Sequence, residues 1–75
     1  MPALVGRGLV VGNSALQGLG VPTEKIVPVD VSGKGRMVLN SSNWHICQEQ
    51  PAAGQHLTAN QDALLGVVKW GEYCP

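Results

Sequence analysis

The apolar residues of this 75-residue chain change their spacing from one segment to the next, and each spacing predicts an element. Between residues 8 and 19 the apolar positions recur every three or four residues, the period of one helix face: Leu9, Gly12, Leu16 and Leu19. Gly20 and Pro22 follow, and both residue types commonly end helices. The pattern predicts one helix over residues 8–19, with Gly12 on its apolar face where it allows close approach to a neighbouring element.

Three later segments have the alternating, β-branched composition of strands. They are residues 25–31 (KIVPVDV), 44–50 (WHICQEQ) and 62–70 (DALLGVVKW). Pro28 has no N–H to donate to a neighbouring strand, so the first of these strands is expected at a sheet edge or at a bulge. The opening residues 1–5 end at Gly6 and suit an edge strand or an extended lead-in.

Turns rich in Gly, Ser and Asn separate the first strands, and the segment 51–61, which opens with Pro-Ala-Ala-Gly, connects the last two. If those two strands pair antiparallel around this connection, Trp44 and Trp70 come near each other at the same end of the hairpin. Taken together, the pattern predicts an α+β fold in one domain that spans residues 1–75 and has a small core.

Charge and hydropathy exclude several classes of partner. Five basic residues balance five acidic ones with no run of either sign, whereas nucleic-acid binding requires a concentrated basic surface. No apolar stretch approaches the roughly 18–20 residues that cross a bilayer. The opening sequence has neither the positive region nor the cleavage site of a signal peptide. We therefore expect no nucleic-acid partner and no membrane insertion of this segment.

The chain contains two cysteines, Cys47 and Cys74. A disulfide between them would close a loop of about 27 residues and contribute roughly 3–4 kcal/mol, a large share of the stability of so small a domain. The alternative is two unrelated buried thiols in a cytosolic protein. Because small exported domains often compensate for thin cores with disulfides, we predict the bridge and an extracytoplasmic location, either at the cell surface or secreted.

Patterns for catalysis and metal binding are weak. The spacings of His45, Cys47, His56 and Cys74 match no standard zinc finger or ribbon. A disulfide would also consume the thiol that a Cys47–His45 nucleophile pair requires. The carboxylates are scattered, and GKGR at residues 33–36 lacks the spacing of a phosphate-binding loop. The sequence therefore predicts no enzyme, no metal site and no cofactor.

The remaining candidates for function are side chains expected on the surface. Trp44 and Trp70 could stack on a sugar ring or clamp a partner, or either could complete the core, since the chain has no Phe. Arg36, near Lys34 on a glycine-rich loop, could contact an anionic ligand, or it could be a solvated loop charge. Trp44, Trp70 and Arg36 are the predicted ligand contacts.

Three motifs follow one another along most of the chain. The first is MPALVG with the helical spacing after it, in which Pro2, Leu4 and Gly6 fit a Val-Pro-x-Val-x-Gly opening. The second is a strand that runs into Pro51-Ala-Ala-Gly54, and the third is the closing strand ALLGVVKW. In this order they resemble the PASTA domain (penicillin-binding protein and serine/threonine kinase associated). The segments GKGRM, NWHICQEQPAAG and GVVKWGEYCP are similar to a cysteine-containing variant from Gram-positive bacteria.

This resemblance implies one helix packed on a three-stranded, largely antiparallel sheet, in agreement with the pattern above. It also implies an extracytoplasmic setting beside transmembrane kinases or cell-wall synthases. There the domain would act as a non-catalytic binding module for peptidoglycan fragments (muropeptides) or related cell-wall ligands. The alternative is a structural or protein-interaction module of the cell envelope that serves as a spacer, dimerisation unit or docking domain for an envelope protein.

The predicted bridge can be tested by intact mass with and without reductant. We expect reduction to add two hydrogens, because each cysteine sulfur gains one when the Cys47–Cys74 bond is cleaved. An unchanged mass would show that the two thiols are free.

Overall fold

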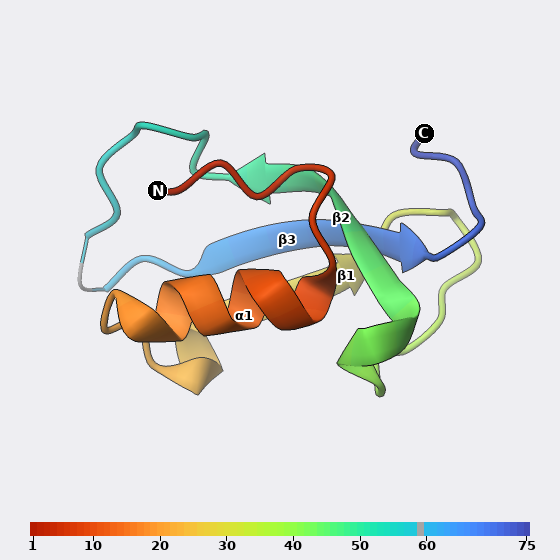
Figure 1. Cartoon of the computed structure of the whole chain (residues 1–75), viewed down its shortest axis with the longest axis horizontal. Helices are drawn as coiled ribbons and strands as arrows, with labels where there is room; N and C mark the ends of the chain where they lie inside the picture. Colours follow the sequence, from red (N-terminus) through yellow and green to blue (C-terminus); the bar gives the residue numbers. More distant parts are fainter. Residues whose placement is uncertain (59) are drawn as a thin grey trace.

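The computed structural model describes residues 1–58 and 60–75, which form one helix and a three-stranded mixed sheet (Figure 1). The elements are, in chain order, α1 (Leu9–Gly18), the 3-10 turn η1 (Thr23–Lys25), β1 (Ile26–Asp30), the 3-10 turn η2 (Ser41–Asn43), β2 (Trp44–Gln50) and β3 (Ala63–Lys69). In the part of the chain so described, no helix has the length and apolar character needed to cross a membrane. The predicted α+β class, with one helix and three strands, is confirmed.

The sheet has the strand order β1-β3-β2, so the last strand lies at its centre. β2 and β3 pair antiparallel, as expected for two strands joined by the 51–62 connection. β1 and β3 pair parallel, so the sheet is mixed rather than largely antiparallel. The difference arises because β3 lies between β1 and β2, and these two strands run in opposite directions. A central strand that is antiparallel to β2 is therefore parallel to β1.

Both edges of the sheet agree with the sequence analysis. β1 is an edge strand that pairs with β3 alone, which accommodates Pro28 without loss of a ladder hydrogen bond. The free edge of β2 is covered by the opening segment, which is an extended lead-in rather than a strand. Its backbone exchanges two hydrogen bonds with Ile46, since Gly6 N donates to Ile46 O and Ile46 N donates to Arg7 O, each at 2.8 Å.

α1 lies across one face of the sheet (Figure 1) and buries Leu9, Gly12 and Leu16 against it. The sheet contributes the other half of the core, with side chains from alternate positions: Ile26, Trp44, Ile46, Ala63, Leu65 and Val67. The predicted helix was one residue too long at each end. Leu19 lies past the last turn with 67% of its surface exposed, so it is not part of the buried face.

Gly12 marks the point where helix and sheet approach most closely. A Cβ at this position would lie 2.5 Å from Ile46 Cδ1 and 3.8 Å from the Cδ1 atoms of Leu4 and Leu65. The predicted role of Gly12 in close approach is therefore confirmed. Ile46 is fully buried, so its methyl group cannot swing away without disturbing the neighbouring side chains.

We expect Gly12→Ala and Gly18→Ala to change the free energy of unfolding in opposite directions. In both variants the higher helix propensity of Ala relative to Gly adds up to about 1 kcal/mol to the free energy of unfolding. At Gly12 this gain is outweighed by overpacking, typically about 1–3 kcal/mol, for a net loss of about 1 kcal/mol. At Gly18 nothing lies within 4 Å of the added methyl group, so the gain remains. Urea denaturation of the two variants tests this, and equal stabilisation by both would contradict the close packing.

Candidate functional site

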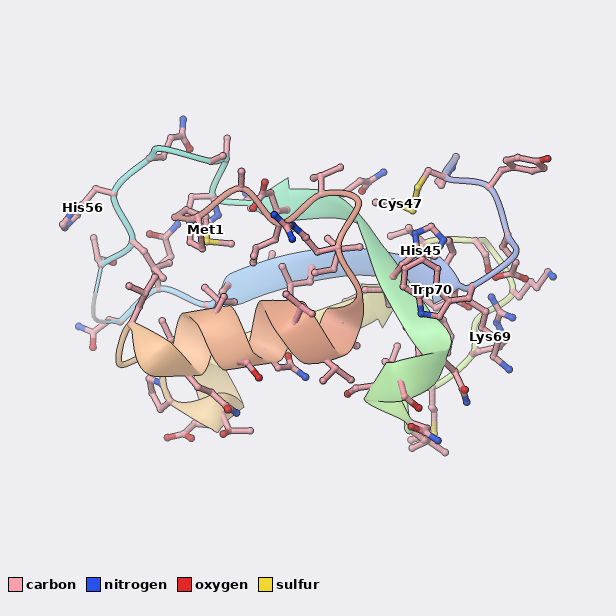
Figure 2. All side chains as sticks on the ribbon, viewed as in Figure 1. Met1, His45, Cys47, His56, Lys69 and Trp70 are labelled. Atoms are coloured by element: carbon pink, nitrogen blue, oxygen red, sulfur yellow. A yellow bond between two sulfur atoms is a disulfide. The ribbon has the colours of Figure 1, made fainter. Side chains whose placement is uncertain are left out.

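The predicted contact residues lie at one end of the sheet: Trp70 follows the C-terminal end of β3 (Figure 2), Trp44 is the first residue of β2, and Arg36 lies against the Trp44 ring. Trp44 is paired with Lys69 in the register of β2 and β3, and Trp70 follows directly. The two tryptophans therefore come to the same end of the hairpin, as predicted. Their surroundings differ, however, and only one of them offers an exposed ring.

Trp44 is a core residue, with 2% of its surface exposed. The guanidinium carbon of Arg36 lies 5.0 Å from the Trp44 ring centroid, and the Lys69 Nζ lies 5.8 Å from it. Cations at these distances are attracted to the electron-rich face of the indole ring. A ligand could reach this ring only by displacing side chains that already cover it, so Trp44 is placed to stabilise the fold.

Arg36 connects two carboxylates that lie far apart in the sequence. Its Nε donates to Asp30 Oδ2 at 3.1 Å, and one terminal nitrogen donates to Glu72 Oε1 at 2.7 Å. The Asp30 side chain is only 1% exposed, and it also accepts the backbone N–H groups of Ser32 and Arg36. An incoming anion would have to compete with both carboxylates, so Arg36 in this position is a clamp between β1 and the tail.

The hydrogen bonds of this clamp shift the pKa values of its members. Those from Arg36 and Ser32 hold the pKa of Asp30 far below its usual range. Hydrogen bonds from Arg36 and Lys34 lower the pKa of Glu72 to about 2, and the two carboxylates raise the pKa of Arg36. All three groups are therefore charged at neutral pH, which keeps the clamp intact.

Trp70 is the exposed aromatic residue of the pair, with 56% of its surface accessible. Its ring stacks on the imidazole of His45, with centroids 4.7 Å apart and 23° between the ring planes. Figure 2 shows the two rings side by side at this end of the molecule. Of the three predicted contact residues, Trp70 is the one whose surface a ligand or partner could reach directly.

The predicted disulfide joins Cys47 to Cys74 and ties the C-terminal tail to β2. The ladder between β2 and β3 shifts register between Ile46 and Gln48, which leaves Cys47 at a bulge. A bulge re-aims the side chain of the extra residue, and here that side chain meets the tail. Close by, His45 Nε2 lies 3.2 Å from the backbone oxygen of Glu72.

A cavity of about 670 Å³ opens at the opposite end of the molecule. It lies between the end of α1 and the loop after β2, and its lining consists of Met1, segment 19–22, Lys25, segment 54–58 and Gln61. The Met1 amino group donates to the Gln55 backbone oxygen at 2.8 Å and fixes the loop to the first residue. The sequence analysis did not identify this cavity, because no motif in the sequence indicates that these distant segments meet.

Comparison with known proteins adds no relative: no family model, no curated protein and no solved structure matches this chain. The fold and its chemistry therefore define only a class, a small disulfide-linked α+β module. It has a charged clamp and an exposed Trp–His pair at one end and an open cavity at the other.

We expect the stability of the protein to decrease as the pH falls from about 4.5 to about 2, the ordinary and folded pKa values of Glu72. A carboxylate whose folded pKa is lowered stabilises the fold above its unfolded pKa, and that contribution is lost as the pH falls through the folded value. Thermal unfolding across this range should show the loss in the wild type and a flatter profile in Glu72→Gln.

The matched control is Glu24→Gln, at an exposed glutamate of η1. This variant should keep the wild-type pH profile. A Glu72→Gln profile that is as steep as that of the wild type would show that Glu72 does not contribute to acid stability.

Proposed function

We propose that this protein is an extracytoplasmic, non-catalytic binding module for peptidoglycan fragments, and that the cavity beside α1 is its binding site. The observation that carries the proposal is the cavity itself. Its volume of about 670 Å³ falls within the range of roughly 300–1,000 Å³ typical of small-ligand sites. The order of motifs that resembles a PASTA domain supports the ligand class, and the disulfide supports a location outside the cytoplasm.

The chemistry of the lining suits a muropeptide. Leu19, Val21 and Pro22 present an apolar wall on which the faces of N-acetyl sugars can rest. Lys25 is a cationic side chain of the lining, and its Nζ lies 3.8 Å from the Asp62 carboxylate with both side chains substantially exposed. Exposed ion pairs of this length are weak, so a stem-peptide carboxylate can exchange places with Asp62 at little cost.

A second candidate function, a protein-interaction module of the cell envelope, is favoured by apolar surface at the disulfide end. Tyr73 is 96% exposed beside the Cys47–Cys74 bridge, and Trp70 is also accessible. Exposed aromatic side chains of this kind are frequent anchors of protein partners. The two functions use opposite ends of the molecule, so a single set of variants distinguishes them.

Titration with soluble muropeptides, followed by backbone amide shifts, tests the cell-wall proposal. We expect shifts in residues 19–21 and 54–58, and about tenfold weaker binding for Lys25→Gln because a charge-assisted hydrogen bond is lost. Trp70→Ala is the matched variant at the other end and should leave this affinity unchanged.

The absence of any amide shift at millimolar muropeptide would refute cell-wall binding. Loss of capture of an envelope protein in Trp70→Ala, with no effect of Lys25→Gln, would instead support the protein-interaction module. Size-exclusion chromatography of the wild type identifies the case in which the partner is a second copy.

A further inference from the structure

Three potential metal ligands meet beside the exposed Trp70. His45, Cys47 and Cys74 each offer one potential donor atom, and these three atoms lie within 4.8 Å of one another. The fourth residue of the set considered from the sequence, His56, lies at the opposite end of the molecule (Figure 2). The grouping depends on the bulge in β2, which directs Cys47 toward the tail, and on the tail itself, which brings Cys74 to the sheet.

The imidazole of His45 is already held in a fixed orientation. Its ring stacks on Trp70, and its Nε2 lies 3.2 Å from the backbone oxygen of Glu72. A carbonyl oxygen only accepts, so Nε2 carries the proton and Nδ1 keeps the lone pair in the neutral ring. Metal-binding histidines characteristically donate their second ring nitrogen to a carbonyl or carboxylate in this way.

We propose that reduction of the Cys47–Cys74 disulfide converts this end of the molecule into a binding site for a thiophilic metal ion such as Zn²⁺. Two thiolates and one imidazole are the three-ligand protein set of several zinc sites, in which a water or other ligand fills the fourth position. Tetrahedral zinc has Zn–S bonds of about 2.3 Å and Zn–N bonds of about 2.0 Å, so its donor atoms lie roughly 3.5–4 Å apart. The separations of at most 4.8 Å are close to this spacing, and Cys74 lies on the exposed tail, where its position can adjust once the disulfide is cleaved.

The chemistry balances with a dithiol as the reductant. The disulfide accepts two electrons and two protons from the dithiol, which closes to its own disulfide, and two cysteine thiols result. Each thiol then releases its proton when its sulfur binds the metal. Exchange with the disulfide form of the dithiol reverses the process: that disulfide takes up two electrons and two protons, the Cys47–Cys74 bond re-forms, and the ion loses both thiolate ligands and is released. The site is thus open only to the reduced protein, and it is independent of the cell-wall proposal, which uses the other end of the molecule.

The test is a titration of the reduced 75-residue chain with Zn²⁺ under anaerobic conditions, by competition with a chromophoric chelator. We expect one Zn²⁺ per chain in the reduced protein and none in the oxidised protein. His45→Gln should weaken binding at least tenfold, since loss of even an outer partner of a ligand typically costs about 10–100-fold. Replacing Zn²⁺ by Co²⁺ should give a thiolate-to-cobalt charge-transfer band that is lost in Cys74→Ser.

His56→Gln is the matched control and should bind as the wild type does. If the reduced chain unfolds, we expect Zn²⁺ to restore native amide dispersion in the wild type and in His56→Gln, but not in His45→Gln. Binding that does not depend on His45, binding of one ion by two chains, or no binding at all would each overturn the site.

Discussion

The C-terminal tail is held against the sheet through Glu72 and Cys74, and the contacts of Glu72 extend through Arg36 to the end of the core around Trp44. Glu72 pairs with Arg36, which also pairs with the nearly buried Asp30 and covers the Trp44 ring. Two residues further on, Cys74 is joined to Cys47 at the bulge of β2. A domain of 75 residues buries only about 60% of its unfolded surface, so covalent and ionic ties of this kind replace part of the core that a larger protein would have.

These ties give the two ends of the molecule different properties. At the tail end Arg36 and Lys34 are paired with Asp30 and Glu72, and the Trp70–His45 stack and the disulfide lie beside these ion pairs. At the opposite end the first residue, the end of α1 and the loop after β2 enclose a cavity whose cation, Lys25, is only loosely paired. The molecule therefore has one end held by a disulfide and ion pairs and another end with an open cavity. The proposed cell-wall site and the proposed metal site lie on opposite sides of that division.

Features of the fold that depend on local information could be predicted from the sequence. Helical spacing predicted α1 to within one residue at each end, and β2 was predicted with the bounds that the structure shows. Pro28 predicted a sheet edge or a bulge for a purely local reason, its missing N–H, and the strand lies at the edge. The pairing of Cys47 with Cys74 followed because the chain offers each cysteine one partner.

The candidate site was harder to predict, because identical side chains can occupy different environments. Trp44 and Trp70 were indistinguishable in the sequence, yet the strand register buries one ring and exposes the other. From the sequence, Arg36 could be a ligand contact or a solvated loop charge. In the fold its guanidinium donates to Glu72, which lies 36 positions further along the chain. The cavity, too, requires the first residue to meet the loop near Gln55.

By itself, then, the sequence determined the elements and the disulfide partners, since spacing, proline chemistry and the number of cysteines are properties of short segments or of the covalent chain. The tertiary structure alone decided the parallel pairing of β1 with β3, the bulge that directs Cys47, the clamp over Trp44 and the cavity. Each of these depends on contacts between distant residues, and those contacts form only when the whole chain has packed around β3.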